Sequence, residues 1–180
     1  MENRAHNRIA LIKDGRGNNL NSHEAIEIVL LQHFRNITQE TCYDREHYIQ
    51  KITKNIPRIF SREDNANLYK PVTKEEVSGV LKEIQNGKAP GPDGFNVDFF
   101  KSCWNIAKQD ILQVVEDSRR HRTILKAMNS SFIALIPKQE QAQTPDRFRP
   151  IALCNIVYKI ISKVVANRLK PLLPILVSGE

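Results

Sequence analysis

The chain has 180 residues, of which 41% are hydrophobic and 26% charged, and its formal net charge is +7. This length and composition are typical of a soluble globular protein of about one domain with an extra lobe. No apolar run approaches the roughly 18 residues of a membrane span, and the first residues lack the apolar segment of a secretory signal. We therefore expect an intracellular protein, in the cytoplasm or nucleus, that is neither secreted nor membrane-bound.

The three cysteines, Cys42, Cys103 and Cys154, lie far apart, with no CxxC pair and no histidine nearby. This spacing argues against a zinc site and against a disulfide framework. We interpret the three residues as buried free thiols.

The positive charge is concentrated in the last third of the chain. Residues 119–180 hold eleven Lys and Arg against three Asp and Glu, net +8, whereas the rest holds sixteen against seventeen, net −1. Such asymmetry favours a polyanionic partner, most simply nucleic acid. An ordinary solvated basic surface is an equal alternative on charge alone.

The N-terminal part predicts a short hairpin followed by a helix. Residues 8–13 are mostly apolar and end at the turn dipeptide Asp14-Gly15. Asn21 is placed as the N-cap of the helix, with Glu24 three residues on, and apolar residues follow at helical spacing as far as Ile37.

The next 35 or so residues carry weaker signals. A second helix is predicted from about Tyr48 to Ile56, before Pro57. Residues 57–72 are polar and irregular, so we expect a linker there.

A third helix is predicted over residues 74–86. Thr73 and Glu76 fit a capping box, in which the Thr73 hydroxyl accepts from the Glu76 amide while the Glu76 side chain reaches back. Gly87 is placed as the residue that ends the helix in the left-handed conformation.

The second half predicts a loop, a helix, a strand and a long final helix. Residues 87–94 hold two prolines and three glycines, which exclude a helix. A helix is predicted next, with its apolar side centred on Ile111. Residues 131–136 are predicted to form a strand that ends at Pro137. Residues 155–169 form an amphipathic helix ending before Pro171.

Three stretches in register resemble the reverse transcriptase of LINE-type (non-LTR) retrotransposons, especially those of plants. They are Lys88–Phe95 with Phe99, Phe100, Lys101 and Trp104; Ala134–Lys138; and Phe148–Asn155 with Tyr158–Lys163 and Asn167–Lys170. The resemblance is strong over residues 71–180 and weaker over 4–40. Ala152 departs from the family, which more often has serine there.

The resemblance implies an α+β, predominantly helical fold: the fingers of a right-hand polymerase with short β-hairpins. We expect residues 1–56 to be an N-terminal helical region preceding the polymerase and residues 57–72 a linker. Residues 73–180 are then the N-terminal extension and fingers of an incomplete reverse transcriptase domain.

Two cations are the candidate nucleotide-binding residues. A strand ending at Lys138, a polar loop and a return at Arg149 predict a hairpin that presents both. By resemblance they hold the triphosphate of the incoming nucleotide, and a compact ammonium with a forked guanidinium suits phosphate oxygens. The plain alternative is a pair of surface charges beside a strand.

The proline- and glycine-rich loop is interpreted as architectural, because it lacks the spacing of a Walker motif. The loop residues concerned are Lys88, Pro90, Gly91, Pro92, Asp93 and Gly94. Lys159, Lys163 and Arg168 are candidates for binding the backbone of template RNA, and equally for the wet face of an amphipathic helix.

No catalytic residue and no metal ligand is recognised in this sequence. Polymerase chemistry needs two metal ions held by aspartates, and by resemblance these belong to a palm domain that this sequence lacks. We expect Mg²⁺ only in the complete enzyme and no activity from this chain alone. A helix 155–169 without its palm is expected to expose apolar surface and favour self-association.

The resemblance implies an RNA template, a DNA primer and a deoxynucleotide as partners. The leading interpretation is a reverse transcriptase fragment that contacts template and incoming nucleotide. A stand-alone nucleic-acid-binding remnant and a non-functional product of a decayed element are the alternatives.

Overall fold

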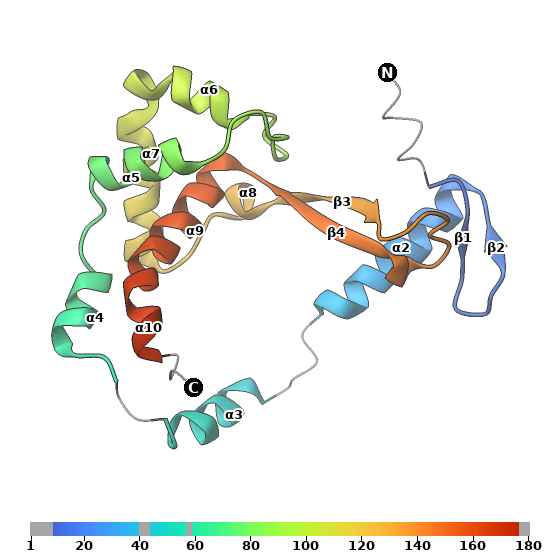
Figure 1. Cartoon of the computed structure of the whole chain (residues 1–180), viewed down its shortest axis with the longest axis horizontal. Coiled ribbons are helices and arrows are strands. Elements are labelled where there is room, and N and C mark those ends of the chain that lie inside the picture. Colours follow the sequence, from blue (N-terminus) through green and yellow to red (C-terminus); the bar gives the residue numbers. More distant parts are fainter. Residues whose placement is uncertain (1–8, 40–43, 57–58, 177–180) are drawn as a thin grey trace. The chain divides into compact units, whose positions relative to one another are not determined.

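The computed structural model describes residues 9–39, 44–56 and 59–176. They are mostly helical, with two small antiparallel sheets (Figure 1), which agrees with the expected α+β class. The chain forms two compact units. The first contains residues 1–55 and 133–151, and the second contains residues 56–132 and 152–180. A β-hairpin made of β3 (Ser131–Pro137) and β4 (Phe148–Cys154) has strand residues in both units.

The first unit begins with the predicted hairpin. Strands β1 (Ile12–Lys13) and β2 (Asn19–Leu20) pair antiparallel, with Ile12 opposite Leu20. The Asp14 carboxylate accepts hydrogen bonds of 2.8 Å from the backbone N–H groups of Arg16 and Asn18 and so closes the turn. The hairpin prediction is confirmed at the described residues, and the turn chemistry explains it.

Helix α2 (His23–Thr38) follows, but the predicted N-cap is wrong by one residue. The Ser22 hydroxyl accepts from the backbone N–H of Ala25 at 3.3 Å, so Ser22 is the cap and Asn21 lies outside it. Serine and asparagine are almost equally good caps, and sequence alone does not choose between neighbours. The second predicted helix is present as α3 (Arg45–Thr53), which buries none of its residues.

Among its described residues, the first unit has a small core of four buried side chains: Ile12, Ile26, Leu30 and Phe148. Phe148 begins strand β4, so the outer part of the β3–β4 hairpin packs with the N-terminal elements. The backbone N–H of Lys13 also donates to the carbonyl of Gln143, in the loop of that hairpin, at 2.6 Å. A 3-10 turn, η1 (Pro145–Arg147), ends that loop.

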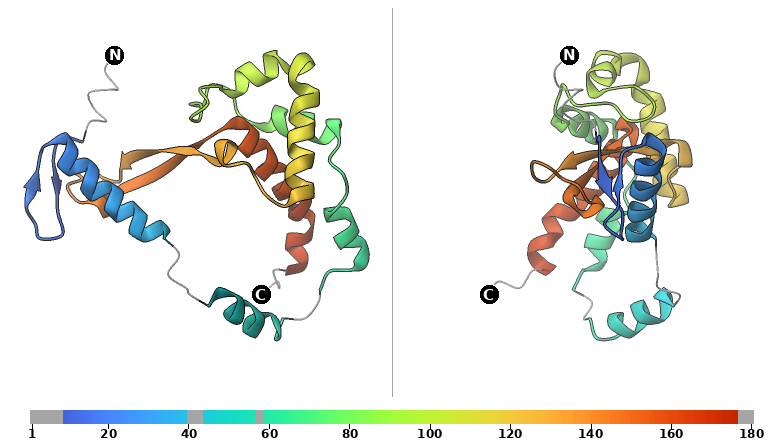
Figure 2. Two further views of the ribbon diagram at one scale, coloured as in Figure 1. Left: turned by 180° about the vertical axis from the view of Figure 1, so that it is seen from behind. Right: turned by 90° about the vertical axis from the view of Figure 1, so that its right-hand side faces the viewer.

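The second unit is helical (Figure 2). Its elements are α4 (Arg62–Leu68), α5 (Lys74–Glu83), α6 (Val97–Ser102), α7 (Trp104–His121), α8 (Lys126–Asn129), α9 (Ile156–Leu169), the 3-10 turn η2 (Lys170–Leu172) and α10 (Leu173–Leu176). Helices α5, α7 and α9 pack against one another around the core. Strand β3 and helices α7 and α9 lie where the sequence predicts a strand and two helices.

Helix α4 lies inside the segment that was predicted to be a linker, residues 57–72. Its amino end is a complete capping box: the Ser61 hydroxyl accepts from the Asp64 amide at 3.0 Å, and the Asp64 carboxylate accepts from the Ser61 amide at 2.9 Å. The helix was not predicted because its seven residues have no apolar periodicity. Capping and contacts with α9 stabilise it instead.

Helix α5 starts as predicted but ends earlier. Thr73 caps it by accepting from the Glu76 amide at 3.2 Å, whereas the Glu76 side chain does not reach back and binds Arg168. The helix ends at Glu83. Gly87 has the expected positive φ of 71°, but it lies in the loop beyond the helix, where its N–H donates to Asp98.

The core of the second unit contains twelve buried hydrophobic residues among those described, from α5, α6, α7 and α9 and from Val72. Four of them, Ile156, Ile160, Ile161 and Val164, belong to α9. The apolar side of this helix was expected to lack a partner, but α5 and α7 cover most of it. Val165 is 52% and Leu169 39% exposed. Self-association through exposed apolar surface stays a prediction.

Candidate functional site

The candidate nucleotide-binding residues lie on the β3–β4 hairpin. Lys138 directly follows β3, and its backbone N–H donates to the carbonyl of Arg147 at 2.8 Å, where the opposite strand begins. Arg149 is the second residue of β4, and its side chain is exposed. Both belong to the first unit. The two residues thus belong to one hairpin, as the sequence predicts, with Lys138 directly after β3 and Arg149 on β4. Phosphate binding itself stays a prediction.

Local contacts hold the Lys138 side chain. Its ammonium donates to the carbonyl of Asp146 at 2.7 Å, across the hairpin loop. The Asp146 carboxylate pairs with Arg147 at 3.3 Å. A hydrogen bond from Thr144, with the positive charges of Arg147 and Lys138, lowers the pKa of Asp146. The Asp146 carboxylate therefore stays ionised near neutral pH, and it partly neutralises the positive charges of Arg147 and Lys138.

The proline- and glycine-rich loop docks on the start of α9 in the second unit. A Cβ added to Gly91 would lie 2.5 Å from the backbone nitrogen of Asn155 and 2.6 Å from the carbonyl carbon of Cys154, and it would also clash with the Asn155 side chain. Only glycine allows this approach. Gly91 therefore allows close packing between the loop and the start of α9. An architectural role for the loop as a whole stays a prediction.

The loop itself is a tight turn over residues 91–94. The N–H of Gly94 donates to the carbonyl of Gly91 at 3.1 Å, and Gly94 has a φ of 77°. The Asp93 carboxylate accepts from the N–H of Phe95 at 3.0 Å. Pro92 occupies the second turn position, where its fixed φ is favourable. Lys88 and Pro90 lie before the turn, and Lys88 is exposed.

Asn155 joins three segments and was not assigned a role from the sequence. It is 3% exposed. Its side-chain oxygen accepts from the N–H of Asp93 at 3.2 Å, and its amide donates to the carbonyls of Ala127 at 3.0 Å and Met128 at 3.3 Å. An asparagine before an apolar helical run suggests an N-cap, but this side chain caps no helix. It links two of the family-like motifs, 62 residues apart.

The three candidate template-binding residues on α9 have different surroundings. Lys159 is partly exposed. Lys163 pairs with Glu83 at 3.0 Å, and the hydrogen bond from Lys163 is the main cause of the lowered pKa of Glu83. Both partners of this pair are substantially exposed, so the pair is weak and exchangeable.

Arg168, in contrast, donates all the hydrogen bonds of its guanidinium to groups of the second unit. Nε and Nη2 each donate at 2.7 Å to one oxygen of Glu76, a bidentate pair. Nη1 donates to the carbonyls of Leu68 and Lys70 at 3.0 and 2.7 Å, and Nη2 also donates to that of Pro71 at 3.2 Å. These contacts account for all five N–H groups of the guanidinium, which leaves none for a template phosphate.

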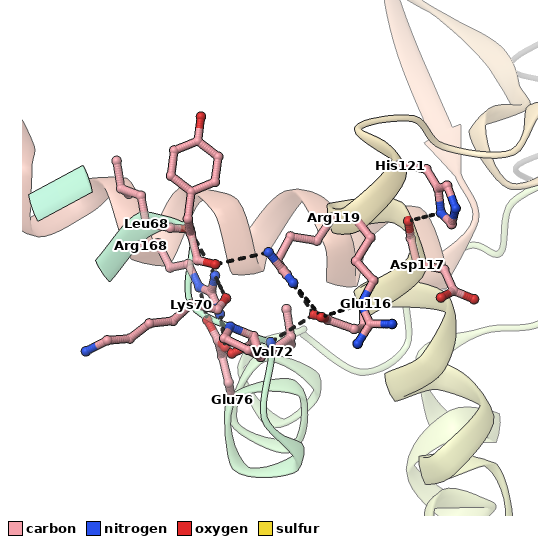
Figure 3. A network of polar contacts seen from close by, with 12 residues as sticks. Leu68, Lys70, Val72, Glu76, Glu116, Asp117, Arg119, His121 and Arg168 are labelled. Atoms are coloured by element: carbon pink, nitrogen blue, oxygen red, sulfur yellow. Dashed lines mark hydrogen bonds and ion pairs between the residues drawn. The ribbon is translucent and has the colours of Figure 1, made fainter. Parts of the chain in front are cut away.

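A second arginine holds the same segment from helix α7 (Figure 3). Arg119 makes a bidentate pair with Glu116 at 2.7 and 2.6 Å, and its Nη1 donates to the carbonyl of Tyr69 at 3.0 Å. The Glu116 carboxylate also accepts from the N–H of Val72 at 3.0 Å. These contacts, led by the bond from Arg119, lower the pKa of Glu116 to about 2.

Within the described ranges, no three His, Cys, Asp or Glu side chains gather closely enough to hold a metal ion. Among the same residues, no helix is both long and apolar enough to cross a membrane.

Two curated proteins are similar to the chain, whereas no protein-family model matches it. The uncharacterized 149 kDa protein of transposon TX1 from Xenopus laevis is 27% identical over 115 residues, 64% of this chain and 9% of that protein. The retrovirus-related Pol polyprotein of the type-1 retrotransposable element R2 from Nasonia vitripennis is 27% identical over 103 residues, 57% of this chain and 10% of that protein. The chain spans only about a tenth of either relative. These similarities relate it to proteins of non-LTR retrotransposons.

Proposed function

We propose that the chain is part of the reverse transcriptase of a plant-type non-LTR retrotransposon, and that it contributes contacts to the incoming deoxynucleotide and the RNA template. In this proposal residues 73–180 are its N-terminal extension and fingers. The three family-like motifs and the relationship to retrotransposon proteins support the proposal. The observation that carries it is that one hairpin holds both cations, with Lys138 directly after β3 and Arg149 on β4.

The hairpin suits the binding of a triphosphate. Arg149 is exposed and offers two parallel donors to phosphate oxygens, while Lys138 adds a compact positive charge. The Lys138 ammonium has three N–H groups, and the contact with the Asp146 carbonyl uses one of them. A phosphate can therefore be bound without breaking the contact that positions the side chain.

The template contacts are assigned to Lys159 and Lys163. Lys159 is accessible, and the exposed pair between Lys163 and Glu83 can exchange for a phosphate at little cost. Arg168 is left out of this proposal because its donors are all used within the second unit.

Catalysis is proposed to need a palm domain. By resemblance, the aspartates that hold Mg²⁺ belong to that domain, and the metal ions stabilise the charge that develops during nucleotide transfer. The chain alone is expected to bind its ligands and to incorporate no nucleotide. Nucleotide incorporation on an RNA template by the purified chain would contradict this part of the proposal.

The binding test uses a fluorescent deoxynucleoside triphosphate and its anisotropy as the chain is titrated. The substitutions Lys138→Gln and Arg149→Gln should each weaken binding about tenfold, because each removes a charge-assisted hydrogen bond. Arg16→Gln is the matched control: it removes one exposed charge from the same unit, at the turn of the β1–β2 hairpin. Equal losses in all three variants would show unspecific charge attraction and refute the assignment.

A second candidate function, a stand-alone nucleic-acid-binding remnant, is favoured by the net charge of +8 over residues 119–180. Binding to single-stranded RNA should then weaken steeply with salt, because phosphate contacts release counterions. Salt-dependent RNA binding without preference for a triphosphate would favour this alternative. If the chain bound neither RNA nor the triphosphate, the result would favour the third interpretation, a non-functional product of a decayed element.

A further inference from the structure

Residues 61–72, which we call the strap, are fastened to the second unit by side chains of two helices. Arg168 of α9 binds the carbonyls of residues 68, 70 and 71, and Arg119 of α7 binds that of residue 69. Four successive backbone carbonyls are therefore held by two guanidinium groups. Each arginine is itself held by a bidentate ion pair with a glutamate (Figure 3): Arg119 with Glu116, and Arg168 with Glu76.

The strap contributes little apolar packing of its own. Helix α4 buries none of its residues, and of those between Ser61 and Pro71 only Asp64 and Leu68 are partly buried. The capping box of α4 is made by Ser61 and Asp64, both within the strap. Of the strap residues, only Val72, which is 8% exposed, belongs to the hydrophobic core. The attachment is thus polar along its length and apolar at one end.

The strap forms one wall of an open pocket of about 710 Å³ in the second unit. Asn65, Leu68 and Tyr69 line it on that side, and the carboxyl-terminal part of α7 and helix α9 line the others. Buried core side chains, Val115 and Val164 among them, lie at its apolar surface. Moving the strap would expose these side chains without moving α7 or α9.

We propose that the strap is a gate that opens about Val72 as a unit while α5, α7 and α9 stay folded, and that the two arginines set how often it opens. Opening exchanges polar contacts for contacts with water and leaves the other core residues packed. Segments with little buried apolar area are those that open locally in native proteins. The proposal goes beyond the proposed function and does not depend on it.

Hydrogen exchange of the full chain, followed by mass spectrometry, tests the gate. Arg168→Gln on α9 and Arg119→Gln on α7 should each speed exchange in residues 65–72 by about tenfold or more, while exchange in α5, α7 and α9 changes less than about twofold. Two substitutions on different helices should thus speed hydrogen exchange in the same residues, 65–72. Arg120→Gln is the matched control, since Arg120 also pairs with Glu116 but forms no hydrogen bond or ion pair with the strap.

Each outcome decides the proposal. Unchanged exchange in residues 65–72 would show that the arginines do not hold the strap. Equal acceleration throughout the second unit would show that the strap unfolds only with the core. Acceleration confined to the strap in both variants, and not in Arg120→Gln, is the expected result.

A thiol at the pocket surface provides an independent measurement. Val164→Cys places a small group under the strap, at a position 3% exposed. Its reaction with a thiol reagent should be about tenfold faster when combined with Arg168→Gln. The native Cys103 and Cys154 of the same unit are the internal reference. A rise that Cys103 and Cys154 share with the introduced thiol would mean general unfolding and would overturn the gate.

Discussion

The two units of the chain differ in how they are stabilised. Among the described residues, the second unit buries twelve hydrophobic side chains in one cluster, and the first buries four. The first unit depends more on local devices, such as the Asp14 turn and the Ser22 cap. Because stabilisation grows with buried apolar area, the second unit is the stronger scaffold.

This difference separates the candidate chemistry from the scaffold. Lys138 and Arg149, proposed to bind the nucleotide, lie in the unit with the small core. The glycine-rich loop and Asn155, which join the motifs, lie in the unit with the large core. Residues that bind a ligand are commonly presented by less stable segments, whereas motif glycines serve close packing.

The largest expected effect is in the larger core. Ile160→Ala should lower the free energy of unfolding of the second unit by about 2–5 kcal/mol, because Ile160 is 0% exposed and its neighbours close the cavity only in part. Urea unfolding measures this. Ile106→Ala on α7 is the control, since Ile106 is 84% exposed and its loss should cost below about 0.5 kcal/mol. Equal costs would contradict the assignment of the core.

The matching change in the smaller core tests the independence of the units. Ile12→Ala also removes a side chain that is 0% exposed. This smaller core can relax further, so we expect a loss of about 2–3 kcal/mol. Hydrogen exchange should quicken in residues 9–38 and 133–151 and stay unchanged in α5, α7 and α9. Equal loss of protection in both units would show a single cooperative structure.

A smaller effect is expected at the motif loop. Gly91→Ala should destabilise the second unit by about 1–3 kcal/mol, because the new methyl group meets the backbone of residues 154 and 155. Gly79→Ala is the matched control: nothing lies within 4 Å of its added Cβ, and it occupies the middle of α5. Alanine there should stabilise the helix by up to about 1 kcal/mol. Thermal unfolding measures both changes in stability. If Gly91→Ala and Gly79→Ala shifted the stability in the same direction, the close approach at Gly91 would be refuted.

The smallest effect concerns pH. The pKa of Glu116 is lowered from 4.5 to about 2, first of all by Arg119. Since the folded pKa lies below the unfolded one, the ionised carboxylate stabilises the fold above pH 4.5, and this contribution is lost as the pH falls towards 2. Glu116→Gln should therefore have a flatter stability profile between pH 4.5 and 2 than the parent. Parallel profiles in urea unfolding would show that the pairing contributes nothing.

Local signals in the sequence determined most of the secondary structure. The apolar spacing of α2, α5, α7 and α9, the Thr73 cap and the turn at Asp14 each depend on residues within one or two turns, and all were predictable. The hairpin that presents Lys138 and Arg149 was predictable too, because a single polar loop, residues 138–147, joins its strands. Two predictions failed for different reasons. Ser22 is the cap in place of the neighbouring Asn21, and α4 forms without an apolar pattern because capping and contacts with α9 stabilise it.

Only the tertiary structure decided what several polar side chains do. Arg168 was expected either to bind template RNA or to lie on a solvated helix face, but Glu76 and the carbonyls that it binds lie 92 to 100 residues away in the sequence. Glu76 left its capping box for the same reason, since a partly buried charge is more stable when it is paired. Asn155 and Gly91 likewise gain their roles only when distant segments meet. Periodicity shows which side of a helix is apolar, whereas the partner of each polar group depends on which chain segments fold against it.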